Sequence, residues 1–209
     1  MGNRAVITTR ENFENNGVGV YLHWNGGRDS VEAFLQYCEL KGFRSPDTQN
    51  YGWARLAQII GNFFGGTLSV GIDTIDHLDC DNGDNGVYII EGWKIVGREY
   101  FTGEEQHAYS MSDMLKDIDE AQPAKEQLGN YLDSELVKIS EIKLGDTVYV
   151  PDWNGDIRSY KVKGFGDNRI VNGMDVQGLP FAHIISDSRT NINNYIRTTY
   201  VRVAKRSVE

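Results

Sequence analysis

The sequence predicts an α+β protein: two amphipathic helices on one face of an N-terminal antiparallel sheet, then a helical linker and a small β-barrel. Three observations indicate this class. Residues 18–24 alternate in polarity with the period of a half-buried strand. Residues 29–64 carry two apolar stripes at helical spacing. Beyond residue 137, short apolar segments are separated by glycine turns, which is typical of small barrels.

The first strands of the sheet are expected to be residues 5–9 and 18–24, paired as a hairpin. The turn Asn25-Gly26-Gly27 ends the second strand, because glycine accepts the positive φ that a sharp reversal needs. A helix follows, and Asp29 is its expected N-cap. Glu32, three residues later, would complete a capping box.

The remaining elements of the first domain follow from glycine positions and alternation. Gly42 is placed to end the first helix in the left-handed conformation. Residues 68–72 are expected to form a third strand, and residues 87–101 a hairpin with a two-residue turn at Glu91-Gly92. The tryptophans expected in the core are Trp24, Trp53 and Trp93.

Changes in composition divide the chain into an α+β domain over residues 1–102, an acidic helical linker over residues 103–136 and a barrel over residues 137–209. In the linker, Ser110 is the expected cap of a helix.

No apolar run is long enough to span a membrane, and the two cysteines lack metal-ligand spacing. We therefore expect a protein of a reducing cytoplasm.

The net charge of −9 is distributed unevenly. Residues 1–102 carry a net charge of −5, residues 103–142 carry −7, and residues 143–209 carry +3. A non-specific nucleic-acid binder would show a strong basic excess instead. The acidic middle of the chain favours a basic protein as the partner.

Two resemblances add to this interpretation. Leu144-Gly-Asp-Thr-Val-Tyr-Val150 resembles the first strand of SH3-like barrels. Tyr21-Leu-His-Trp-Asn-Gly-Gly-Arg-Asp-Ser30 and Tyr51-Gly-Trp-Ala-Arg-Leu56 resemble uncharacterised proteins carried by phages and mobile elements of Gram-positive bacteria. Small acidic proteins in that setting are often anti-defence factors, including anti-CRISPR proteins. The resemblance therefore implies an accessory protein that inhibits a host defence nuclease by binding it.

On this leading hypothesis the protein is a binding inhibitor without catalytic residues or a cofactor, and its acidic side chains meet a basic partner. Trp153 is expected to be an exposed aromatic residue beside a predicted hairpin turn. With the basic residues Arg158, Lys161 and Lys163 it could contact a protein or an RNA. The expected partner-binding residues are Glu104, Glu105, Asp113, Asp117, Asp119, Glu120 and Trp153.

The acidic loop over residues 73–84 supports a second hypothesis, a metal-dependent nuclease or phosphohydrolase. Carboxylates and a histidine in a short loop can bind a divalent cation. The spacing does not fit an EF-hand, and a solvated loop rich in turn formers explains the same residues. The candidate ligands are Asp73, Asp76, His77, Asp79 and Asp81.

A third hypothesis is nucleotide binding at the glycine turn. Asn25-Gly-Gly-Arg-Asp-Ser30 resembles the phosphate-binding loop of PP-loop ATP pyrophosphatases, which holds a phosphate at a helix N-terminus. Asn25 stands where that family has serine, and the family's parallel sheet is not predicted here. A turn followed by a helix cap explains the same residues. The matching positions are Gly26, Gly27, Asp29 and Ser30.

Overall fold

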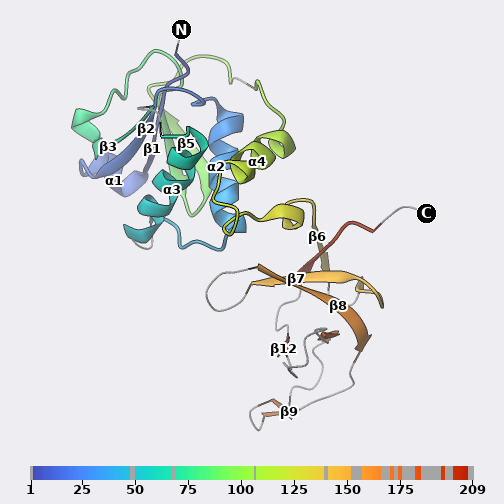
Figure 1. The fold of residues 1–209 in the computed structure, drawn as a ribbon. Coiled ribbons are helices and arrows are strands. Elements are labelled where there is room, and N and C mark those ends of the chain that lie inside the picture. Colours follow the sequence, from blue (N-terminus) through green and yellow to red (C-terminus); the bar gives the residue numbers. More distant parts are fainter. Residues whose placement is uncertain are drawn as a thin grey trace. The chain divides into compact units, whose positions relative to one another are not determined.

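The protein combines helices and sheets, which confirms the α+β class (Figure 1). It divides into two compact units, Met1–Gln127 and Leu128–Glu209. The structure is a computed structural model. The residues that it describes are 2–47, 50–66, 69–105, 107–138, 141–151, 157–165, 170–171, 174–175, 182–184, 194–195 and 200–206.

A five-stranded sheet forms the centre of the first unit. Its strands are β1 (Ala5–Thr9), β2 (Val18–Leu22), β3 (Val70–Thr74), β4 (Val87–Glu91) and β5 (Lys94–Glu99), in the order β3-β2-β1-β4-β5. β1 pairs antiparallel with β2, which confirms the expected hairpin, but β1 runs parallel to β4. The sheet is therefore mixed rather than antiparallel throughout, because the chain crosses from edge strand β3 to the other side of β1 before it enters β4.

Two long helices, α2 (Arg28–Leu40) and α3 (Asn50–Phe63), pack together against one face of this sheet (Figure 1). Their shared core includes the rings of Phe34 and Phe63, whose centroids are 5.2 Å apart in an edge-to-face arrangement. Phe34 and Leu56 are fully buried, as the apolar stripes of the two helices predict.

The opposite face of the sheet is covered by α1 (Arg10–Glu14) and by the segment around the 3-10 helix η1 (Ile75–His77). A side chain at Gly19 would place its Cβ 2.8 Å from Cδ1 of Leu78, so this segment packs directly on the strand. The acidic loop is thus also the second layer of the core. The buried residues on this face of the sheet are Val6, Val87 and Ile89. The partly buried hydrophobic residues that pack against them are Phe13, Tyr21, Ile75, Leu78 and Cys80.

The two ends of α2 differ in how well the sequence predicts them. The N-cap is Gly27, without a side-chain hydrogen bond, and Asp29 lies inside the first turn, so the predicted cap and capping box are wrong. At the other end, Gly42 has φ +68°, as expected. The Phe43 amide donates to the Cys38 carbonyl at 3.2 Å, which completes a Schellman motif.

The β4–β5 hairpin turns one residue later than predicted. Glu91 pairs with Lys94, so the turn is Gly92-Trp93, and Gly92 takes the left-handed φ of +62°. Trp53 and Trp93 are buried as expected. Trp24 is 45% exposed instead, because β2 ends before it at Leu22.

The helix predicted in the linker is α4 (Met111–Glu120), and Ser110 caps it by accepting from the Asp113 amide at 3.2 Å. Met114 and Ile118 of this helix are buried. The compact first unit extends through α4 to residue 127. An independent domain that ends at residue 102 stays a prediction.

In the second unit the sheet order is β12-β11-β8-β7-β13-β6. No barrel closes among the described residues, so the SH3-like barrel stays a prediction. β7 and β8 pair antiparallel, as a hairpin should. The buried core here is Ile142, Val148, Tyr160, Val162, Val201 and Val203.

The elements of the second unit are η2 (Gly129–Tyr131), β6 (Glu135–Lys138), β7 (Thr147–Pro151), β8 (Ile157–Phe165), β9 (Ile170–Val171), β10 (Met174–Asp175), β11 (Ala182–Ile184), β12 (Asn194–Tyr195) and β13 (Tyr200–Val203). β9 and β10 form a separate two-stranded pair. Across the described part of the chain, no helix has both the length and the apolar character needed to cross a membrane.

Candidate functional site

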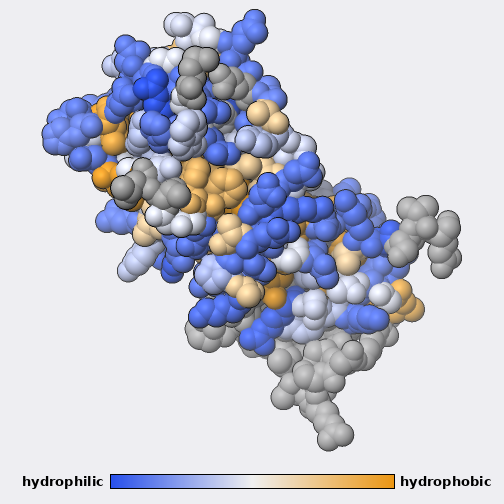
Figure 2. Space-filling view, turned by 45° about the horizontal axis from the view of Figure 1, so that its top comes forward, coloured by the Kyte–Doolittle hydropathy of each residue, from blue (hydrophilic) through white to orange (hydrophobic). Residues whose placement is uncertain are grey.

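The exposed acidic residues of α4 form one row along the solvent side of the helix. Asp113, Asp117 and Glu120 are exposed and are spaced by four and three residues, which places them on one helical face. The molecular face shown in Figure 2 is largely hydrophilic, with hydrophobic areas among the hydrophilic residues. A row of carboxylates of this kind attracts a positively charged partner.

Asp119 does not belong to that row. It is 5% exposed, and Tyr37 of α2 donates its hydroxyl to Oδ1 of Asp119 at 2.6 Å. Burial, together with this hydrogen bond, raises the pKa of Tyr37 above its ordinary value. Asp119 therefore joins α4 to α2, and the prediction that it binds a partner is not supported by its position.

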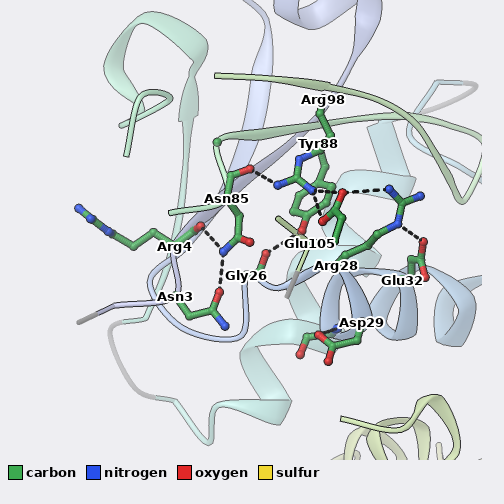
Figure 3. Close-up of polar contacts among 12 residues, drawn as sticks. Asn3, Arg4, Gly26, Arg28, Asp29, Glu32, Asn85, Tyr88, Arg98 and Glu105 are labelled. Carbon is green, nitrogen blue, oxygen red and sulfur yellow. Dashed lines mark hydrogen bonds and ion pairs between the residues drawn. The ribbon is translucent and has the colours of Figure 1, made fainter. Parts of the chain in front are cut away.

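Glu105 also lies within the fold, in a cluster of ion pairs (Figure 3). Both of its carboxylate oxygens accept from Nη1 of Arg98 at 2.9 Å, and Oε1 accepts from Nη1 of Arg28 at 3.1 Å. Arg28 also donates from Nε to Glu32 at 2.7 Å. The carboxylates of Glu32 and Glu105 raise the pKa of Arg28.

The Arg98 guanidinium is held between two aromatic rings. Its Cζ lies 3.7 Å from the ring centroid of Tyr88 and 3.9 Å from that of Phe101. Nη2 of Arg98 donates to the Asn85 carbonyl. Among the described residues, two buried atoms of this cluster have no hydrogen-bond partner: Nε of Arg98 and Oδ1 of Asn85.

Asp29 anchors the chain between β5 and α4. Its Oδ2 accepts from the Tyr109 amide and its Oδ1 from the Ser30 amide, both at 2.7 Å. The sequence pattern suggested a capping residue, because aspartate at the start of a helix usually serves its own first turn. The structure uses this carboxylate for a contact 80 residues away.

The glycine turn of the nucleotide hypothesis brings its four candidate residues together at the start of α2. The Gly26 amide donates to the Asn3 carbonyl at 2.7 Å, and the Tyr88 hydroxyl donates to the Gly26 carbonyl at 3.0 Å. The amides of Gly26 and Ser30 thus have partners within the chain. Nucleotide binding there stays a prediction.

In the acidic loop, the first two aspartates and His77 gather around Thr74. The Thr74 amide lowers the pKa of Asp73, and the Thr74 hydroxyl, 2.6 Å from Oδ1 of Asp76, lowers that of Asp76. Nδ1 of His77 lies 3.3 Å from Oδ1 of Asp73. These contacts account for the local turn.

The later aspartates of the loop face Arg4 or solvent. Asp84 accepts from Nε of Arg4 at 2.7 Å, and Asp79 pairs with the same guanidinium at 3.5 Å. Asp81 is exposed. Within the described residues, no group of three or more histidine, cysteine, aspartate or glutamate side chains is arranged to hold a metal ion.

Sequence reasoning missed the arginine cluster. Tyr88 and Arg98 face each other across the β4–β5 hairpin, so a correct hairpin register would have predicted their stacking. Nothing in the local pattern marks Glu105 as their partner. Trp153 lies outside the described residues, as does the Lys163 side chain; Arg158 and Lys161 are exposed on β8.

Comparisons with known proteins do not extend these observations. The chain matches no known protein family, and neither a curated protein nor a solved structure is significantly similar to it.

Proposed function

We propose that this protein is a non-enzymatic binding protein whose acidic surface on α4 occupies a basic surface of another protein. The partner we propose is a nucleic-acid-binding enzyme of a host defence system, such as a CRISPR-associated nuclease. The sequence resemblance to phage and mobile-element proteins suggests that class of partner. The observation that carries the proposal is the exposed row Asp113, Asp117 and Glu120 above the buried side of the same helix.

The structure narrows the predicted partner-binding set. Glu105 and Asp119 already have partners inside the first unit, so their charges are used for folding. Glu104 is exposed in the connection between β5 and α4 and remains in the set. The proposed surface is therefore Glu104, Asp113, Asp117 and Glu120.

Charged surfaces of this kind act mainly on the rate and selectivity of association, and they weaken as salt rises. A basic groove that binds nucleic acid presents closely spaced lysines and arginines. A rigid helix with three carboxylates on one face can pair with such a groove and exclude the nucleic acid from it.

The test uses a panel of purified defence nucleases, with cleavage and direct binding measured from about 50 to 500 mM salt, a range that crosses strong screening. We expect binding that weakens with salt and inhibition that the triple variant D113K/D117K/E120K abolishes. The matched control is E11K/E14K/E39K, which reverses three exposed acidic residues on α1 and α2. If both triple variants inhibit equally well, or if nothing binds at low salt, the proposed surface is wrong.

A further inference from the structure

We propose that Arg28 and Arg98 form a binding site for an oxyanion, and that Glu105 is an internal ligand that occupies this site and can be displaced. The inference is independent of the acidic surface on α4. The shared chemistry of its ligands is a phosphate or carboxylate group that accepts several hydrogen bonds from guanidinium groups.

The receptor side of the cluster is built on regular elements. Arg98 lies on β5, its side chain is 11% exposed, and the rings of Tyr88 and Phe101 fix its plane. Arg28 is the first residue of α2, so its anionic partner also lies near the positive end of a 13-residue helix. Both arginines direct Nη1 at the same carboxylate.

Stability of the fold does not by itself require an arginine at position 98. Apolar side chains of similar volume often replace buried ion pairs without loss of stability. A guanidinium held in a fixed plane is, however, well prepared to bind a planar or tetrahedral anion through paired hydrogen bonds. In the ion pairs of the cluster, Arg28 and Arg98 face Glu32 and Glu105, so loss of the Glu105 charge leaves Arg98 without a carboxylate in these pairs.

Glu105, the internal ligand, lies in an irregular segment, whereas the two arginines lie on a helix and a strand. Glu105 lies between β5 and α4, in a stretch where the described residues form no helix or strand, and its neighbour Glu104 is exposed. The Glu105 side chain is 28% exposed and that of Arg28 is 32% exposed, so an ion from solvent can reach the pair. Segments with few buried contacts open at low free-energy cost, whereas core strands do not.

The cluster also contains buried polar atoms that lack a hydrogen-bond partner among the described residues. Nε of Arg98 and Oδ1 of Asn85 are buried and have no partner among the described residues, although Asn85 is fully buried. Buried polar groups in native proteins nearly always have partners. The Nε–H of Arg98 is a donor that an oxyanion can satisfy, whereas Oδ1 of Asn85 is an acceptor that needs a donor such as water. Glu105 supplies two acceptor oxygens where phosphate would supply four, so inorganic phosphate and pyrophosphate are the probes, with acetate as the carboxylate.

The first experiment removes the internal charge but keeps the side-chain shape. Calorimetry at constant ionic strength would compare the unmodified protein with E105Q and with the neighbouring control E104Q. We expect E105Q to bind pyrophosphate at least about tenfold more tightly than the unmodified protein, since one charge-assisted hydrogen bond is worth that factor. E104Q should match the unmodified protein, and E105Q/R98K should lose the gain. Equal affinity of E105Q and E104Q overturns the proposal.

The second experiment needs no variant, so it decides the question even if E105Q does not fold. The Tyr109 amide donates to Asp29 just after Glu105, and hydrogen exchange reports its protection. Saturating pyrophosphate should raise exchange at Tyr109 but not in β1, and acetate should do so only at higher concentration. Unchanged protection at Tyr109 would show that no anion displaces Glu105; an effect of acetate equal to that of pyrophosphate would rule out the preference for phosphate.

Discussion

Gly26 lies where two segments approach too closely for any side chain. A Cβ at this position would stand 2.6 Å from the Asn3 carbonyl oxygen and 2.8 Å from Cβ of Ala5. We expect Gly26→Ala to lower the free energy of unfolding by about 1–3 kcal/mol, because the contact is with backbone that cannot rotate away. Urea denaturation measures the change.

The matched control is Gly61 in α3, where an added Cβ meets nothing within 4 Å. Gly61→Ala should raise stability by roughly 0.5–1 kcal/mol, since alanine loses less backbone entropy in a helix. Equal effects of the two substitutions would mean that the close approach at Gly26 does not exist in solution.

The pairing of Arg4 with Asp84 predicts a specific loss of stability in acid. The Arg4 guanidinium holds the pKa of the Asp84 carboxyl below its ordinary value of about 3.9. A carboxyl with a lowered folded-state pKa stabilises the protein above its unfolded pKa, and this contribution is lost as pH falls through the folded pKa. Arg4→Met should therefore flatten the dependence of unfolding free energy on pH below about pH 4.

The control for that measurement is Arg10→Met, which removes the exposed pair of Arg10 with Glu99. Exposed pairs contribute little, so its acid profile should follow that of the unmodified protein. An Arg4→Met profile that runs parallel to the unmodified one would contradict the prediction.

At the scale of the residue, the sequence predicts positions whose role is local. Gly42 ends its helix as expected, because a left-handed conformation depends on the residue itself. Asp29 fails as a predicted cap, because Gly27 takes the cap position and the Asp29 carboxylate also binds an amide far along the chain. The Arg98 cluster was missed because it combines four separate segments, which contribute Arg28, Asn85, Arg98 and Glu105.

Helix α4 offers a test at the scale of the element. Ile118 is fully buried, so Ile118→Ala should cost about 2–5 kcal/mol of unfolding free energy through lost burial and a residual cavity. Asp117→Ala at the exposed position beside it should change stability by less than about 0.5 kcal/mol. Thermal or urea unfolding of both variants measures these changes. If α4 were a loosely attached linker, the two substitutions would lower the free energy of unfolding by similar amounts.

Elements with a strong period were predicted best. The apolar stripes of α2, α3 and α4 place these helices within a few residues. The turn of the β4–β5 hairpin is one residue off. The register shift between Ile89 and Ile90 was also not predicted, because alternation alone does not encode a bulge. The segment around η1 was interpreted as acidic loop, since its charges conceal the apolar residues that face the sheet.

For the whole molecule, the division into units predicts which fragment folds alone. Residues 1–127 should unfold cooperatively, whereas residues 1–102 should not, because that fragment lacks the helix that buries Met114 and Ile118. It also lacks Gln122, which donates to the carbonyl of Ile59 and accepts from Asn62. Near-UV circular dichroism and calorimetry of both fragments make the comparison. A cooperative transition in the shorter fragment would support a domain boundary at residue 102 instead.

The sheet order could not be derived from the sequence, although its strands could. Each strand pattern states which face is buried, but not which strand lies beside it. The expected hairpins, β1–β2 and β4–β5, are both present because short connections favour antiparallel neighbours. The parallel contact of β1 with β4 joins these two hairpins and depends on everything between them.

That central pairing has a consequence for synthesis on the ribosome. β1 emerges early, yet the strand that completes its second side begins only at Val87. At roughly 5–20 residues per second, the nascent hairpin waits on the order of ten seconds with one edge open. During that interval it is exposed to strand exchange with neighbouring chains and to chaperones, so translation speed over residues 10–86 should affect the yield of soluble protein.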